Sequence, residues 1–278
     1  AGPNNFYTSY RIHDFHFKAY GAMFMGQFRP AIEAAEELAA TVPEDFLRIE
    51  SPPMADWNEA YLTVVHHVLI RFGKWQEIID LALPHDPVLY SMTTAVTHYA
   101  KGVAYAATGR VQEAEAERTL FEAACGRVQE SRKLFNNTCE NILNVAREML
   151  TGEIDYRKGK FDSAFERLYK AVELDDGLPY NEPWGWMQPT RHALGALLLE
   201  QGRVGEAEAV YRADLGLDSS LPRPCQHPDN VWALHGYHEC LVKQNRGEEA
   251  AHIAPRLALA QARADKPIQV SCFCRLGE

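Results

Sequence analysis

Apolar and small residues recur with a helical period along most of the chain, and one short phrase punctuates that period. The phrase is a glycine, any residue, a bulky apolar residue, two further residues and a small apolar residue. Its copies begin at Gly26, Gly73, Gly109, Gly159, Gly202 and, degraded to asparagine, at Asn245. Such a phrase is typical of the turn and the start of the second helix in a helical-repeat pair. The chain is therefore predicted to be built from helix pairs.

The turn glycine gives every pair a common register, as position 15 of a unit of about 34 residues. Position 8, where two helices cross closely, is predicted to be small. It holds Ala19, Gly102, Gly152 and Gly195, whereas His66 and His238 depart from the rule. Position 20 should also be small, and it holds Ala31, Ala114, Ala164, Ala207 and Ala250. We therefore predict an all-α, right-handed solenoid of about six helix pairs over residues 1–265, followed by a tail at 266–278.

Most repeats carry extra residues between one pair and the next. Three of these insertions, at 43–56, 175–189 and 218–230, are rich in proline, and the second contains Trp184 and Trp186. Insertions at one point of a repeat emerge on one edge of a solenoid, which is often the binding edge. Because tryptophan is seldom exposed without a reason, we interpret the 175–189 insertion as functional.

The phrase and its register resemble those of the tetratricopeptide-repeat superfamily along the whole chain. The stretches 13–23 and 178–215 are similar to a set of longer bacterial and fungal tetratricopeptide proteins, with a His-Asn-x-His-Phe-type helix and a Glu-Pro-x-x-Trp turn. The resemblance implies scaffolding and partner binding. It also implies that the chain is the C-terminal portion of a longer protein, with a further portion upstream.

In tetratricopeptide superhelices, positions 2, 5, 9 and 12 of the first helices line a concave groove. Here these positions are unusually rich in histidine and aromatic residues. We predict that the groove holds a partner protein segment or a small molecule, because imidazole and aromatic rings can stack and hydrogen-bond. The expected contacts, with the tryptophans of the insertion, are His16, His67, Tyr99, Trp184, Trp186, Trp232, His192 and His235.

An alternative interpretation is a metal-dependent protein, an enzyme included, with zinc, copper or iron held by groove histidines. His13 and His16 are three residues apart on one helix, close enough to share an ion. His192 and His235 occupy the same position of adjacent repeats. Two glutamates could complete the ligand set or act as a base, and these catalytic candidates are Glu153 and Glu239. A third hypothesis is a purely architectural role within a larger assembly.

Charge and composition narrow the partners. The net charge of −10 argues against a nucleic-acid partner, whose phosphates would be repelled. No apolar run reaches the roughly 18 residues needed to cross a bilayer, and no secretory segment opens the chain. We therefore expect a cytoplasmic protein with reduced thiols at its six cysteines. The chain also lacks a phosphate-binding loop, a Gly-x-Ser-x-Gly elbow and a His-Glu-x-x-His motif.

Overall fold

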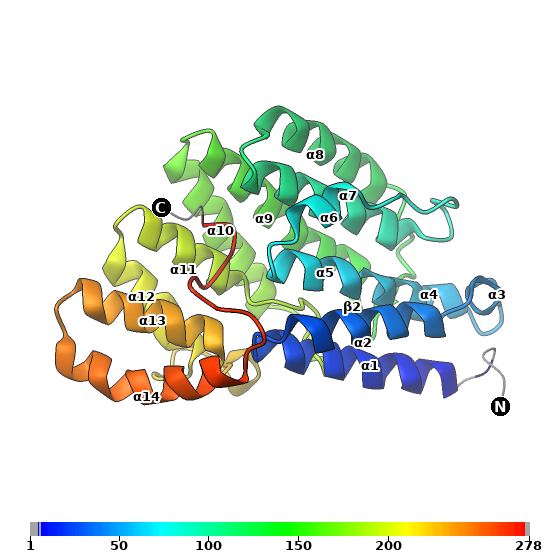
Figure 1. The fold of residues 1–278 in the computed structure, drawn as a ribbon. Coiled ribbons are helices and arrows are strands. Elements are labelled where there is room, and N and C mark those ends of the chain that lie inside the picture. Colours follow the sequence, from blue (N-terminus) through cyan, green and yellow to red (C-terminus); the bar gives the residue numbers. More distant parts are fainter. Residues whose placement is uncertain (1–4, 6, 276–278) are drawn as a thin grey trace. The chain divides into compact units, whose positions relative to one another are not determined.

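The computed structural model describes residue 5 and residues 7–275, and their regular structure is almost entirely helical (Figure 1). The longer helices are α1 (Tyr7–Phe24), α2 (Phe28–Thr41), α5 (Val64–Arg71), α7 (Ser91–Ala107), α8 (Val111–Cys125), α9 (Cys139–Arg157), α10 (Phe161–Asp176), α11 (Thr190–Glu200), α12 (Val204–Asp214), α13 (Val231–Lys243) and α14 (Gly247–Arg263). The short ones are α3 (Glu44–Leu47), α4 (Met54–Asn58), α6 (Trp75–Ile79) and the 3-10 helices η1 (Glu59–Thr63) and η2 (Arg223–Cys225). Two short strands, β1 (Lys133–Leu134) and β2 (Asn137–Thr138), pair as a hairpin. The predicted all-α class is confirmed.

The chain divides into two compact units. Unit 1 comprises Ala1–Tyr20 and Pro30–Met187, and unit 2 comprises Gly21–Arg29 and Gln188–Glu278. The predicted tail contributes its described residues, 266–275, to unit 2, whereas 276–278 lie outside the described part of the chain.

Each copy of the phrase forms the same backbone turn. The φ angle is positive at all six turn residues, from 58° at Asn245 to 77° at Gly109. The residue after each turn donates its backbone N–H to the carbonyl five residues earlier, at 2.8–3.0 Å; one such bond joins Arg110 to Tyr105. This bond ends a helix by satisfying a carbonyl that has no partner inside it, and glycine adopts the required left-handed conformation without steric penalty. The phrase is thus a helix-stop signal with a clear physical cause.

Helices pack in pairs across these turns, as α7 with α8 and α9 with α10 in unit 1, and α11 with α12 and α13 with α14 in unit 2. The small residues of the register explain the close approach. A Cβ added at Gly152 would lie 2.9 Å from Leu168, and one at Gly195 would lie 2.4 Å from the Tyr211 ring. The alanines at position 20 are buried as well. His66, at the close-packed position 8, is buried and its Nε2 lies 2.8 Å from Thr97 Oγ1.

In unit 1 the insertion after α10 is anchored on the β1–β2 hairpin. Asn181 donates to the Leu134 carbonyl at 3.1 Å, and Asn137 donates to the Pro179 carbonyl at 3.1 Å. The hairpin in turn is fixed by Arg132, which pairs with the fully buried Glu59 of η1 at 3.2 Å. Segments far apart in sequence therefore hold one another in place.

In unit 2 the first turn of the chain is held by residues near its C-terminal end. The Asp265 carboxylate accepts the backbone N–H groups of Phe28 and Arg29, at 2.7 and 2.8 Å, where α2 begins. The Trp232 indole donates to the Met23 carbonyl at 2.8 Å, near the end of α1. The N-terminus of α2 is thus capped by a carboxylate that lies far along the chain.

Two findings concern the cysteines and membrane association. Cys272 and Cys274 form a disulfide, which corrects the expectation that all six thiols are reduced, while the other four are free. The expectation rested on the absence of a secretory segment and on the interpretation that Cys272 and Cys274, with one residue between them, are too close to form a redox pair.

No helix among the described residues has the length and apolar character needed to cross a membrane.

Candidate ligand-binding site

The groove histidines and aromatics of unit 1 converge, but they do so in the interior. His16, His67, Tyr99 and Trp186 are each 1–2% exposed. The Trp186 ring packs edge-on against His67 and Tyr99, with centroids 4.9 and 5.6 Å apart. The residues that the sequence register placed on one helix face therefore do lie close together. They contact one another and other side chains of unit 1.

The insertion itself covers the predicted groove positions. Trp186 lies on His67 and Tyr99, and the next residue, Met187, places its sulfur 2.7 Å from His16 Nε2. Trp184 is half-buried and donates its indole N–H to Asp175 at 2.9 Å. The two tryptophans expected to contact a ligand thus contact the rest of the chain.

Burial changes the chemistry of this cluster. Burial lowers the pKa of His16 to about 3, with the nearby charge of His13 adding to the effect. Burial likewise lowers the pKa of His67 to about 3, aided by His66 and His16. His67 Nδ1 and Trp186 Nε1 have no hydrogen-bond partner among the residues described. These imidazoles are neutral near pH 7, which suits packing.

The other predicted contacts belong to unit 2. Trp232 is fully buried and bonded to Met23. His192 is buried with its Nε2 2.8 Å from Asp214, whose other carboxylate oxygen lies 2.8 Å from His227 Nδ1. Burial alone would raise the pKa of Asp214, but the charges and hydrogen bonds of both histidines hold it well below its usual range. His235 is half-buried, and burial lowers its pKa.

The two carboxylates named as catalytic candidates are both paired with arginine. Glu153 lies 2.8 Å from Arg157, and Glu239 lies 2.8 Å from Arg275. Across the described part of the chain, no three His, Cys, Asp or Glu side chains are placed to hold one metal ion. His13 and His16 also have different surroundings, since His13 is half-buried at a cavity and His16 lies in the core.

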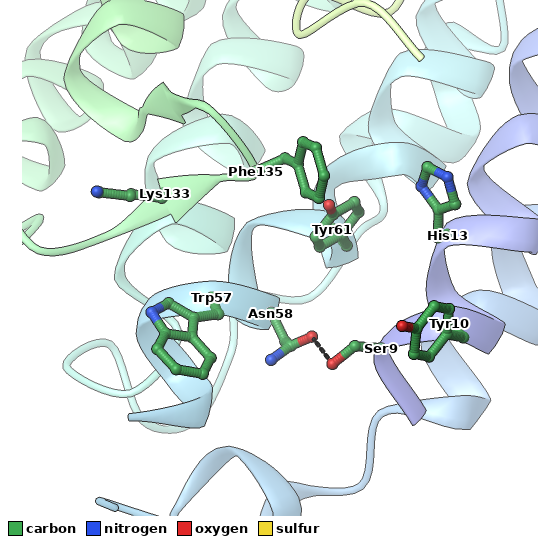
Figure 2. A pocket seen from close by; sticks show the side chains of 8 residues that line it. All are labelled: Ser9, Tyr10, His13, Trp57, Asn58, Tyr61, Lys133 and Phe135. Carbon is green, nitrogen blue, oxygen red and sulfur yellow. Dashed lines mark hydrogen bonds between the residues drawn. The ribbon is translucent and has the colours of Figure 1, made fainter. Parts of the chain in front are cut away.

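That cavity lies within unit 1. Its volume is about 410 Å³, within the range of pockets that bind small molecules. It lies where α1, the α4–η1 segment and the β1–β2 hairpin face one another (Figure 2). It is lined by Ser9, Tyr10, His13, Trp57, Asn58, Tyr61, Lys133 and Phe135. Most of this lining is aromatic, and three of the rings are exposed to solvent.

Several polar groups of the cavity have no partner. Tyr61 is 6% exposed, yet its hydroxyl makes no hydrogen bond to any described residue. Burial raises the pKa of Tyr61 to about 12, so the hydroxyl keeps its proton at neutral pH. The same lack of a partner within the described chain applies to the indole N–H of Trp57 and the ammonium of Lys133. Trp57 is 44% exposed and Lys133 is exposed, so these polar groups are open to water and to a ligand that enters the cavity.

The walls of the cavity are held by contacts among the lining residues and by contacts of their neighbours. Ser9 donates to the Asn58 side chain at 3.0 Å, which ties α1 to α4. Arg132, next to Lys133, binds Glu59 and the Leu89 carbonyl, the latter at 2.9 Å. Phe135 sits at the hairpin tip with φ of 55° and stacks on His13, with centroids 6.2 Å apart. A preformed hollow of this kind needs little ordering to accept a ligand.

Of this lining, the sequence analysis singled out only His13. Trp57 follows the first proline-rich insertion and is 44% exposed. The argument applied to Trp184 and Trp186, that an exposed tryptophan needs a reason, would have found Trp57. No sequence signal points to Phe135, because its place depends on the hairpin geometry.

Comparison with protein-family models and with curated proteins finds no match for this chain.

Proposed function

We propose that this protein is a binding protein that holds a small aromatic molecule in the cavity of unit 1. Its scaffold, on this proposal, is a tetratricopeptide-like, right-handed solenoid of about six helix pairs. The recurrent turn and the packing of helices in pairs support that architecture. The proposed ligand site is the cavity beside His13, and not the buried residues that pack against Trp186.

One observation carries the proposal: five of the eight residues that line a cavity of about 410 Å³ have aromatic rings, and the hydroxyl of one of them, Tyr61, makes no hydrogen bond to a described residue. Tyr61 also connects the two regions, because its ring packs edge-on against His16, with centroids 5.3 Å apart. His13 and His16, one turn apart on α1, therefore face the cavity and the core respectively. Of the predicted groove histidines, His13 lines the cavity and His16 packs against Tyr61, which also lines it.

Binding is tested by titrating a panel of naphthalene and indole derivatives into the protein and measuring heat or tryptophan fluorescence. We expect at least one compound to bind. The double variant Trp57→Ala/Phe135→Ala removes two exposed walls and should weaken that binding about tenfold or more. Tyr169→Ala, an exposed aromatic of α10 outside the cavity, is the matched control and should leave the affinity unchanged. Equal affinity of the double variant and the wild type would refute the proposal.

A further inference from the structure

The formally charged side chains of the cavity wall are of positive sign only. None of the chain's 38 acidic residues is among the lining residues, and the only formally charged side chain there is Lys133. Its ammonium makes no ion pair with any described residue. A single unpaired cation beside apolar rings, in a protein of net charge −10, is complementary to a negatively charged group.

The hydrogen-bonding groups near this charge are donors only. The Trp57 indole can donate and cannot accept, and the same is true of the Lys133 ammonium. Figure 2 shows both nitrogens on the side of the cavity away from Tyr10 and His13, with the Lys133 side chain extending outward from its strand. Charge-assisted bonds from such donors are strongest to a carboxylate or another oxyanion.

The opposite side of the cavity is a set of rings. Figure 2 shows Tyr10, His13 and Tyr61 there, with Phe135 above Tyr61. Flat aromatic surfaces favour a flat aromatic guest through offset and edge-to-face contacts. The Tyr61 hydroxyl lines the cavity and makes no hydrogen bond to a described residue, so it can meet one polar substituent of the guest.

Resting on the proposed function, we infer that the ligand is an aromatic carboxylic acid, with its ring system among Tyr10, His13, Tyr61 and Phe135 and its carboxylate at Lys133 and Trp57. A cationic guest would also be attracted by aromatic faces. It would, however, meet the like charge of Lys133 and find no carboxylate in the wall. Because the only formally charged side chain in the wall is positive, the cavity favours a negatively charged ligand.

The test uses three probes that share one ring system and differ in charge: 2-naphthoate, 2-naphthamide and 2-naphthylmethylammonium. Each is titrated calorimetrically into wild type, Lys133→Gln and Trp57→Phe, at low and at high salt. Lys160→Gln is the matched control, because Lys160 is exposed and lies outside the cavity. Trp57→Phe keeps an aromatic wall and removes only the N–H donor.

We expect 2-naphthoate to bind wild type most tightly, and less tightly as salt increases. Lys133→Gln should weaken 2-naphthoate about fivefold and leave 2-naphthamide within about twofold, while Trp57→Phe should weaken 2-naphthoate about threefold. The control should bind as wild type does.

Two outcomes separate the inference from the function on which it rests. If the amide or the ammonium probe binds as well as the carboxylate, and the Trp57→Ala/Phe135→Ala variant abolishes that binding, the carboxylate inference is overturned while the cavity remains a binding site. If none of the three probes binds and the panel gives no other ligand, both are overturned.

Discussion

At the scale of single residues, the burial of several histidines makes the stability of this protein depend on pH. His16, His66 and His67 lie in the interior of unit 1, where water cannot stabilise a charged imidazole. Burial lowers the pKa of His66 to about 4, against a small opposing effect of a backbone hydrogen bond at Thr63. These three side chains stabilise the fold only while they are neutral.

Stability should therefore fall as pH falls. An unfolded histidine takes up a proton near pH 6.5, whereas the folded ones resist until about pH 3 to 4, so the unfolded state binds more protons in between. Each contributes a slope of up to about 1.4 kcal/mol per pH unit in that window. Urea unfolding at several pH values between 7.5 and 5 measures the slope. His67→Gln should flatten it by about one such increment, and an unchanged slope would contradict the assignment.

At the scale of elements, the turn phrase and its register were readable from sequence because both have local causes. A glycine of positive φ and the N–H to carbonyl bond across it depend on six consecutive residues. The small residues at positions 8 and 20 depend on one neighbouring helix. Such patterns specify helix pairs without knowledge of the rest of the chain.

The sequence did not show which residues cover the predicted groove. The register placed His67 and Tyr99 on one stripe, and they do share Trp186 as a neighbour. What covers that stripe is a proline-rich insertion, whose path depends on a hairpin about 45 residues earlier, as in the bond from Asn181 to Leu134. Exposed tryptophan and buried tryptophan look identical in sequence, and for that reason Trp186 was assigned to a ligand.

The two tryptophans of the insertion should differ in energetic importance. Trp186→Ala would leave a cavity in the core of unit 1, and we expect it to lower the free energy of unfolding by about 3–5 kcal/mol. Trp184→Ala removes a half-buried ring and one bond to Asp175, and about 1–2 kcal/mol is expected. Chemical unfolding of both variants gives the comparison. Similar small losses would mean that Trp186 is free to leave the core and engage a partner.

At the scale of the whole molecule, the second unit combines a short segment from the first helix pair with the C-terminal part of the chain. Residues 21–29 belong to it together with 188–278. Gly26 illustrates how closely they fit, since a Cβ added there would lie 3.0 Å from Ala264 and 3.2 Å from Val231. An open repeat array has contacts only between neighbouring repeats, so this unit departs from that rule.

Asp265 is the residue to change at this scale. Asp265→Ala leaves the first N–H groups of α2 without their acceptor and removes a negative charge from the helix start, so about 1–2 kcal/mol should be lost. Amide exchange at Phe28 and Arg29 should accelerate by a corresponding factor. Asp162→Ala is the control, because Asp162 lies in the first turn of α10 and accepts no backbone N–H among the described residues; it should lose about 0.5 kcal/mol. Equal effects would show that charge alone, and not the distant cap, stabilises α2.

The link between Asp265 and the start of α2 also constrains the order of events during synthesis. A repeat array can fold progressively as it leaves the ribosome, because each repeat needs only the one before it. Here the partner of Phe28 lies 237 residues later, and loop closure over such a span is slow. The turn at Gly26 is therefore completed late, because the first N–H groups of α2 lack this acceptor until residue 265 has emerged from the ribosome.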